Sequence, residues 1–335
     1  MAKPKVSIIL PTYQRASVLP EAIEALLSQS LADLTLSVMD DGSTDETGDV
    51  VQQFRDPRLR YLPCEHLGIP AIINAGFESS PGEYVIVCHD HDRYHPDFLG
   101  TLADLLDRYP SATYAHSGVA ILDPSGTFER MRFIYDYAEL TTGREFLRRH
   151  LLRGIASPVT AISMVRGSAI NGKFLDPRYA GCADVELWMR LCLAGDVAYT
   201  PRPLLSLRER DSASLYFQKL HELSDYVLTA KESYLHTIAD PAERRLITQR
   251  WKTDVDLTGL AAMSSALDHR QRALVPGILD FVRRRGTTAG MLALRFLAWL
   301  PDPIAASVLN GLRHVRHLAH KVVRGRQMER CENHT

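Results

Sequence analysis

The chain has 335 residues, of which 24% are charged and 45% hydrophobic, and its formal net charge is −1. These values are ordinary for a folded protein with room for two structural regions, and the charge gives no reason to expect a nucleic-acid partner. Five scattered cysteines without a CxxC pair favour reduced thiols over disulfides or a zinc site. Because no signal-peptide pattern and no uncharged apolar window of 18 residues occurs, we expect a cytoplasmic protein.

The N-terminal part of the chain alternates between strand-like and helix-like segments. Continuous apolar, β-branched runs predict strands at 6–10, 34–39, 58–62 and 84–88. Apolar residues at helical spacing predict helices that include 19–27, 44–54 and 71–77, and another that starts near Pro96. This alternation favours a parallel α/β sheet with right-handed crossovers.

The middle of the chain is mixed, and its end is helical. Apolar runs predict strands at 112–122 and 159–165, and helical spacing predicts a helix at 184–194. Beyond these segments the pattern is helical only. We therefore expect two regions: residues 1–215 with the sheet, and residues 216–335 as a helical C-terminal region.

The end of the chain is basic. Between residues 310 and 330, a single acidic residue, Glu329, accompanies these cations: Arg313, Arg316, Lys321, Arg324, Arg326 and Arg330. Next to the Leu/Trp-rich segment 291–300, this composition fits peripheral contact with an anionic membrane surface. A solvated helix face is the alternative.

Polar side chains follow three of the predicted strands. Thr12 and Tyr13 come after the first strand, Asp40 and Asp41 after the second, and the run HDHD at 89–92 after the fourth. In parallel sheets, ligands bind beyond the carboxyl ends of the strands. These positions therefore define one candidate ligand edge.

The acidic turn DDGSTD at 40–45 has two interpretations. Its carboxylates can accept hydrogen bonds from the N–H and O–H groups of a base or ribose. Alternatively, Ser43 or Thr44 caps the following helix, and the acidic residues behind it favour the helix dipole. Capping does not explain why Asp40 and Asp41 stand at the end of a strand.

The run at 89–92 also has two interpretations. Its side chains can hold a divalent cation, Mg²⁺ or Mn²⁺, against a diphosphate, or they can form a solvated turn before the helix near Pro96. Because the preceding run VIVC is so apolar, the ligand-facing interpretation is favoured.

Three further groups are less distinctive. Asp184 can deprotonate an acceptor hydroxyl if it lies beside the cleft, although spacing alone favours a surface position. Glu186 and Arg190, four residues apart on the same predicted helix, are expected to form a surface salt bridge. Arg208 and Arg210 can contact phosphate or belong to a solvated loop.

The chain contains no P-loop, GxGxxG, HExxH or GxSxG motif. Instead it contains, in this order, VSIILPTYQR, LLSQSL, VMDDGSTDET, GEYVIVCHDHD with HPDFL, and ADVELWMRL. Together these segments resemble the family 2 inverting glycosyltransferases over about residues 4–215. The resemblance implies a GT-A fold, with a Rossmann-like, mostly parallel central sheet flanked by helices, followed here by the helical C-terminal region.

The resemblance also implies roles for single residues. The nucleotide site would consist of Pro11, Thr12, Tyr13, Asp40, Asp41 and Asp90. The acidic metal motif of the family falls on 89–92, so His91 and Asp92 would bind Mn²⁺ or Mg²⁺. Asp184 would be the general base of a single displacement that inverts the anomeric carbon.

Two departures from the family pattern concern the diphosphate. His91 occupies the position of the usual metal-binding Asp and adds no negative charge to the site, so either His91 is an unusual ligand or Asp90 and Asp92 bind the metal. Many members also carry a cation before the Asn that corresponds to Asn74, whereas the segment LGIPAII at 67–73 has none. Arg208 or Arg210 would have to compensate.

We therefore expect a glycosyltransferase that uses a nucleotide-diphosphate sugar, with UDP or dTDP favoured because an Asp suits a pyrimidine imide N–H. The acceptor would be a saccharide or a lipid-linked acceptor in bacterial-type polysaccharide or glycoconjugate synthesis. The C-terminal region would position the acceptor, form a homodimer, or dock at the inner face of the cytoplasmic membrane. A non-catalytic nucleotide-sugar or carbohydrate binder is the alternative. A nucleotidyltransferase on a similar sheet is disfavoured, because that class typically carries a Gly-rich loop with Arg or Lys after the first strand and the segment PTYQRAS lacks glycine.

Overall fold

The computed structural model describes residues 3–79, 82–122, 128–132, 137–152, 160–208, 220–268, 271–300, 304 and 307–308. Within these residues the strands are β1 (Val6–Thr12), β2 (Leu34–Asp40), β3 (Leu59–Pro63), β4 (Tyr84–Val87), β5 (Arg93–Tyr94), β6 (Ala112–Leu122), β7 (Phe128–Arg132), β8 (Leu140–Thr141), β9 (Ser163–Arg166) and β10 (Asp196–Arg208).

The α-helices are α1 (Leu19–Leu27), α2 (Thr47–Gln52), α3 (Ile69–Ser79), α4 (Phe98–Arg108), α5 (Gly143–Leu152), α6 (Ala183–Ala194), α8 (Leu220–Tyr234), α9 (Pro241–Asp268), α10 (Val275–Arg285) and α11 (Thr288–Trp299). Short 3₁₀ turns lie at Thr160–Ile162, Gly167–Ala169, Pro177–Cys182, Leu235–Thr237 and Arg272–Leu274.

All ten strands join one sheet, with the order β3-β2-β1-β4-β9-β6-β10-β5 and with β7 and β8 paired to β6 and β10. The four strands β3, β2, β1 and β4 are parallel, and β6 and β10 are parallel to each other. β9 runs antiparallel to β4 and β6. The parallel part and the helical C-terminal region confirm the predicted fold class.

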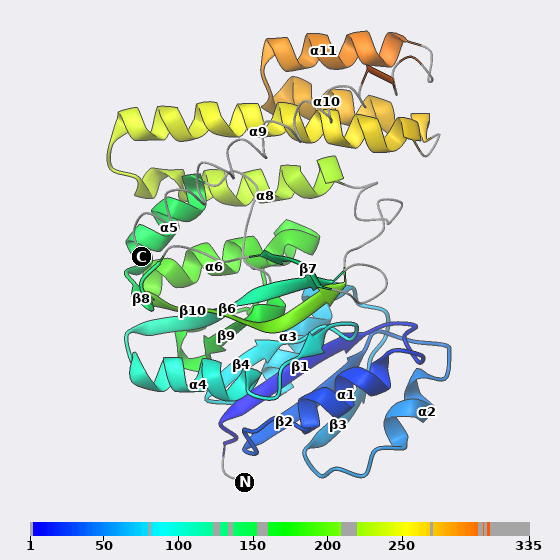
Figure 1. Cartoon of the computed structure of the whole chain (residues 1–335), viewed down its shortest axis with the longest axis vertical. Coiled ribbons are helices and arrows are strands. Elements are labelled where there is room, and N and C mark those ends of the chain that lie inside the picture. The colour runs from blue at the N-terminus through cyan, green and yellow to red at the C-terminus, as the bar shows by residue number, and fades with distance from the viewer. Residues whose placement is uncertain are drawn as a thin grey trace. The chain divides into compact units, whose positions relative to one another are not determined.

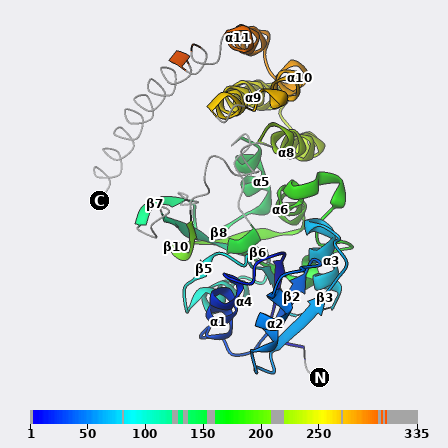
Figure 2. The ribbon, with the colours of Figure 1, turned by 90° about the vertical axis from the view of Figure 1, so that its right-hand side faces the viewer.

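Helices cover both faces of the sheet (Figures 1 and 2). On one face, Leu19 and Ile23 of α1 and Leu102 of α4 pack against Ile8 of β1 in one apolar core. On the other face, the rings of Tyr114 in β6 and Trp188 in α6 lie 5.0 Å apart. α3 also covers this second face, where its Gly76 approaches Ile9 of β1.

The chain divides into two compact units, and the division falls within α8 and α9. The first comprises 1–210 and 226–247, and the second comprises 211–225 and 248–335. In the second unit, Asp225 forms ion pairs with Arg284 and Arg285 of α10. No helix in the described part of the chain is both long enough and apolar enough to span a membrane.

The turn after β2 differs from the expected helix cap. α2 begins at Thr47, and neither Ser43 nor Thr44 caps it. Instead Ser43 Oγ accepts from the backbone N–H of Gln14, and Thr44 Oγ1 accepts from the Gln14 side chain. The two hydroxyls therefore join this turn to the loop after β1, a long-range contact that sequence spacing does not reveal.

Candidate functional site

The candidate site lies at the carboxyl ends of β1, β2 and β4. β1 is central among them, because the chain builds β2 and β3 on one side of it and then returns to place β4 on the other. In parallel sheets such a reversal of strand order opens a crevice where ligands bind. Thr12 at the end of β1 is paired with Asp40 at the end of β2, and the backbone N–H of Cys88 after β4 donates to the carbonyl of Ile9 in β1.

Asp41 organises the loop that follows β3. The backbone N–H groups of Leu67 and Gly68 donate to its Oδ1 at 2.7 and 3.2 Å. His66 Nδ1 lies 3.1 Å from its Oδ2. Gly42 and Gly68 have φ of +82° and +81°, a backbone conformation that favours glycine. Asp41 is thus buried but satisfied, as buried carboxylates must be.

Asp40 faces the protein. Its Oδ1 accepts from the backbone N–H of Ser43 at 2.9 Å, and its Oδ2 accepts from the Tyr61 hydroxyl at 2.6 Å. Burial and this hydrogen bond raise the pKa of Tyr61 well above its usual value. Of the three predicted nucleotide carboxylates, Asp40, Asp41 and Asp90, Asp40 therefore binds the protein through both oxygens, to Ser43 of its own turn and to Tyr61 of β3.

An aromatic pair lies beside Asp41. The rings of Tyr13 and His66 are 4.6 Å apart and tilted by 37°. Tyr13 is 46% exposed, and the His66 side chain is 63% exposed. Two exposed rings next to a carboxylate offer stacking and hydrogen bonding to a planar base. Sequence analysis identified Tyr13 but missed His66, because nothing in the sequence places it opposite Tyr13.

A chain of hydrogen bonds links β1 to the segment after β4. Thr12 Oγ1 donates to Asp90 Oδ2 at 2.9 Å, and His91 Nδ1 lies 2.9 Å from Asp90 Oδ1. Burial raises the pKa of Asp90, but the hydrogen bonds from His91 and Thr12 outweigh it and hold the pKa below the usual range. Arg15 Nε lies 4.0 Å from Asp90 Oδ2. Arg15 is a cation at this edge that sequence analysis missed.

Three side chains after β4 form a group suited to a metal ion. Ligand atoms of His89, His91 and Asp92 all lie within 4.8 Å of one another. Asp92 is 3% exposed, and among the residues that the structure describes its buried Oδ1 has no hydrogen-bond donor. An unsatisfied buried carboxylate oxygen is costly unless a cation binds it, so these residues fit a divalent metal. His91 and Asp92 were the predicted ligands, and the structure adds His89.

Asp184 lies in the first turn of α6 and is partly accessible to solvent. Burial raises its pKa to about 6, although a hydrogen bond from the backbone N–H of Val185 and the charge of His89 oppose the rise. A carboxylate with a pKa near neutrality suits general-base chemistry. Just before this helix, Ala180 has φ 45° and ψ −130°, a conformation rare for residues other than glycine.

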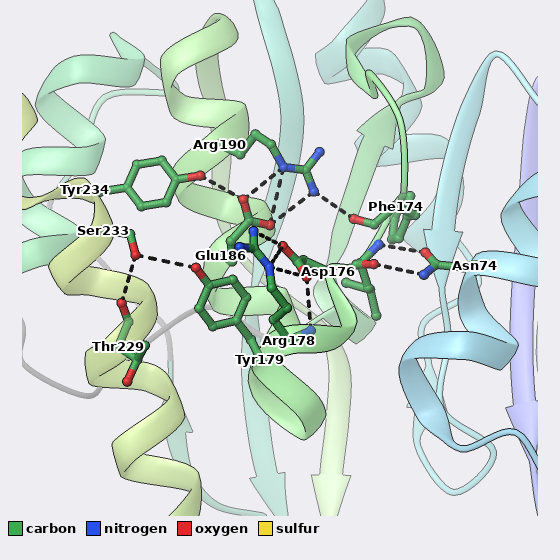
Figure 3. Close-up of polar contacts among 11 residues, drawn as sticks. Asn74, Phe174, Asp176, Arg178, Tyr179, Glu186, Arg190, Thr229, Ser233 and Tyr234 are labelled. Atoms are coloured by element: carbon green, nitrogen blue, oxygen red, sulfur yellow. Dashed lines mark hydrogen bonds and ion pairs between the residues drawn. The ribbon is translucent and has the colours of Figure 1, made fainter.

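Polar contacts hold α6 at Glu186 and Arg190 (Figure 3). Glu186 Oε1 accepts from the Tyr234 hydroxyl at 2.7 Å and from Arg190 Nε at 3.0 Å. Arg190 Nη2 donates to the carbonyl of Phe174 at 3.0 Å. The predicted Glu186–Arg190 pair forms, but Glu186 is 6% exposed, so a surface position was wrong. Helical spacing does not reveal that Tyr234 covers this face.

Asn74 of α3 holds the segment that leads into α6. Its Nδ2 donates to the Leu175 carbonyl, and its Oδ1 accepts from the Leu175 N–H, both at 2.8 Å. This pair of bonds joins α3, which carries Asn74 (Figure 3), to the segment before α6. Of the predicted phosphate contacts, Arg208 is the last residue of β10, paired with Leu122, and Arg210 lies outside the described residues.

Comparison with known proteins agrees with this geometry. The sequence model described as Glycosyl transferase family 2 matches residues 7–171, which include β1, β2, β4 and the 89–92 segment. The chain belongs to this family. As a family 2 glycosyltransferase it shares the transferase class and the GT-A fold that the sequence motifs predicted.

Its relatives differ in length and known activity. The chain is 31% identical over 209 residues to an uncharacterized glycosyltransferase of Rickettsia felis, covering 61% of this chain and 34% of that protein. It is 31% identical over 132 residues to a GalNAc(5)-diNAcBac-PP-undecaprenol beta-1,3-glucosyltransferase of Campylobacter jejuni, covering 38% of this chain and 41% of that one. The chain thus spans about a third of the Rickettsia relative's length.

Among solved structures, the fold of this family 2 chain is similar to S. aureus TarS 1–349 in complex with UDP, with a TM-score of 0.58. The sequences are 16% identical, and the match covers 88% of this chain and 90% of the other. At this identity the similarity concerns the fold alone.

The raised pKa of Asp184 predicts a stability effect. A carboxyl whose folded pKa exceeds its unfolded value stabilises the fold when protonated, and that contribution is lost as pH rises through about 6. Asp184→Asn keeps an oxygen for the Val185 N–H but carries no charge. We expect the variant to melt at a higher temperature than the wild type at about pH 7.5 and the difference to shrink toward pH 4.5.

Calorimetric melting of protein treated with EDTA measures this effect. Asp104→Asn on the exposed side of α4 is the control and should follow the wild type. Melting temperatures of Asp184→Asn that equal those of the wild type at both pH values would contradict the raised pKa.

Proposed function

We propose that this chain transfers a sugar from a nucleotide-diphosphate sugar, with UDP or dTDP favoured, to an acceptor hydroxyl with inversion of the anomeric carbon. One set of contacts supports the proposal: the hydrogen bond from Thr12 to Asp90 joins the loop of Tyr13 to the metal-ligand group at 89–92, and the charge of His89 in that group acts on Asp184. Membership of family 2 gives this combination its meaning.

The base of the nucleoside would stack on the exposed side of the Tyr13–His66 pair. Their exposed rings offer stacking, and Asp41 offers a carboxylate for the imide N–H of uracil or thymine. Asp41 already accepts from the Leu67 and Gly68 N–H groups, and His66 Nδ1 lies 3.1 Å from its Oδ2, which leaves one of the about four acceptor sites of a carboxylate. A further donor can therefore bind without displacing the loop. The UDP complex of the TarS neighbour supports this choice of base.

The diphosphate would lie near Arg15 and the 89–92 group. There a divalent cation, Mn²⁺ or Mg²⁺, would neutralise the negative charge that develops on the departing diphosphate. Arg15 is close to Asp90 and half exposed, so its guanidinium can reach an anion at this edge. It supplies the cation that the segment before Asn74 lacks.

The transfer would be a single displacement. Asp184 takes the proton from the acceptor hydroxyl, and that oxygen forms a bond to the anomeric carbon. The bond from that carbon to the diphosphate oxygen breaks, and the nucleoside diphosphate leaves with the electron pair. Glu186, Arg190 and Tyr234 would hold α6, and Asp184 with it, against the approaching acceptor.

The acceptor would be a saccharide or a lipid-linked acceptor. The name of the Campylobacter relative includes an undecaprenol diphosphate, which favours a lipid-linked one. On α11, Leu292, Phe296 and Trp299 are 61%, 56% and 79% exposed. Residues 310–330 with their cations lie outside the described residues but follow directly in sequence. Apolar anchors next to basic residues fit the surface of an anionic membrane.

Replacing Asp184 tests the catalytic proposal. We expect Asp184→Asn to lower transfer by about 10²- to 10⁴-fold, the usual contribution of a general base, while donor binding stays within about twofold. The nucleoside diphosphate that is released measures donor hydrolysis and transfer to a saccharide acceptor, and calorimetry measures donor binding. Asp104→Asn is the control. A variant that transfers at the wild-type rate would remove Asp184 as the base, and donor binding without transfer in the wild type would favour the non-catalytic alternative.

Replacing the exposed face of α11 tests membrane contact. We expect the wild type to sediment with vesicles that contain phosphatidylglycerol and not with pure phosphatidylcholine vesicles. The double variant Phe296→Ser and Trp299→Ser should bind about tenfold more weakly, because each side chain loses apolar burial. Leu246→Ser, which removes an apolar side chain that is 64% exposed on α9, is the matched control. Equal binding of both variants, or none by the wild type, would contradict the proposal.

A further inference from the structure

The metal-ligand group of this chain has an unusual composition for a site next to a diphosphate. Two of its three side chains, His89 and His91, offer ring nitrogens, and only Asp92 offers carboxylate oxygens. Mg²⁺ prefers oxygen ligands, whereas imidazole suits first-row transition metals. The two ring nitrogens therefore favour a transition metal over Mg²⁺ in this group.

The protein orients His91 for coordination. Its Nδ1 lies 2.9 Å from Asp90 Oδ1, and Asp90 also accepts from Thr12. A carboxylate bound to one ring nitrogen fixes the tautomer and leaves the other nitrogen with its lone pair, as around many metal-ligating histidines. The Nε2 of His91 lies 3.9 Å from the Oδ1 of Asp92. Bonds of about 2.1 Å to each atom let both reach one cation.

Asp92 provides independent evidence for a cation. Its side chain is fully buried, and its Oδ1 accepts no hydrogen bond within the described part of the protein. The other oxygen lies 3.0 Å from His89 Nδ1. The unsatisfied oxygen thus faces His91, inside the group.

His89 is also held in place. Its backbone N–H donates to the Tyr94 hydroxyl at 2.6 Å, and that hydroxyl donates to its carbonyl at 3.0 Å. Its Nε2 lies 3.3 Å from Thr160 Oγ1. The rings of His89 and His91 stack with centroids 5.6 Å apart and planes inclined by 12°. Because both ring nitrogens of His89 have a partner, this ring exchanges one of those contacts for the metal when it binds the ion that His91 and Asp92 share.

We propose that His89, His91 and Asp92 form a two-histidine, one-carboxylate centre that binds a divalent first-row transition metal, such as Mn²⁺ or Co²⁺, in preference to Mg²⁺. The proposal deepens the proposed function, since the same cation would face the diphosphate. One carboxylate and two neutral rings leave a bound divalent ion with a net positive charge toward that ligand. Of Mn²⁺ and Mg²⁺, these ligands therefore favour Mn²⁺, the transition metal.

Metal titrations without any nucleotide test the proposal. Full-length protein is treated with EDTA, dialysed and titrated calorimetrically with Mn²⁺, Co²⁺ and Mg²⁺, and the visible spectrum of the Co²⁺ complex reports nitrogen ligation. We expect Co²⁺ and Mn²⁺ to bind at least about tenfold more tightly than Mg²⁺, with Co²⁺ tightest. His89→Gln and His91→Gln should each weaken Co²⁺ binding by about tenfold or more and leave Mg²⁺ binding unchanged.

Matched variants complete the test. His95→Gln, an exposed histidine of the same segment outside the group, should bind Co²⁺ like the wild type. His91→Asp should strengthen Mg²⁺ binding and weaken Co²⁺ binding, because it restores an oxygen ligand. Mg²⁺ binding as tight as Co²⁺ binding in the wild type overturns the proposal without any variant, as does unchanged Co²⁺ binding in both Gln variants. Since no donor is present, selective metal binding with no sugar transfer would reject the proposed function and keep this centre.

Discussion

The site depends on burying four carboxylates, Asp40, Asp41, Asp90 and Asp92, at one edge of the sheet. Burying such groups is costly unless donors or cations satisfy them. Donors at this edge satisfy three of them: the Tyr61 hydroxyl binds Asp40, the Leu67 N–H binds Asp41, and Thr12 Oγ1 binds Asp90. Within the described part of the chain, the oxygen of these four carboxylates that has no donor is Oδ1 of Asp92, and it lies 3.9 Å from His91 Nε2. The need to satisfy buried carboxylates thus accounts for the contacts of these loops and is the reason to propose a cation beside Asp92.

Much of the fold could be predicted because its core strands are continuous apolar runs. The strand predicted at 112–122 has those bounds as β6, and the helix predicted at 184–194 begins one residue earlier as α6. β5 and β8 have two residues each, too few to give a periodic signal. The helix predicted at 44–54 is shorter and spans Thr47–Gln52 as α2. The residues before it, Ser43, Thr44 and Asp45, instead accept hydrogen bonds from the loop after β1.

The site was predictable only where chemistry stands at the end of a strand. Thr12, Asp41 and the 89–92 segment followed buried strands, so their shared edge could be inferred from topology. His66 and Arg15 lie in loops, and only tertiary structure brings them to Asp41 and Asp90. The raised pKa of Asp184 likewise reflects burial. Its role as base came from the family resemblance and remains a proposal.

We propose that the edge formed by β1, β2 and β4 binds a pyrimidine nucleoside diphosphate. Calorimetric titration with UDP, dTDP, GDP and CMP in the presence of Mn²⁺ tests this binding, with Asp41→Asn as the variant. We expect UDP or dTDP to bind at least about tenfold more tightly than GDP or CMP and Asp41→Asn to lose this preference, because one charged hydrogen-bond acceptor is lost. Absence of binding to all four, or an unchanged preference in Asp41→Asn, would contradict it.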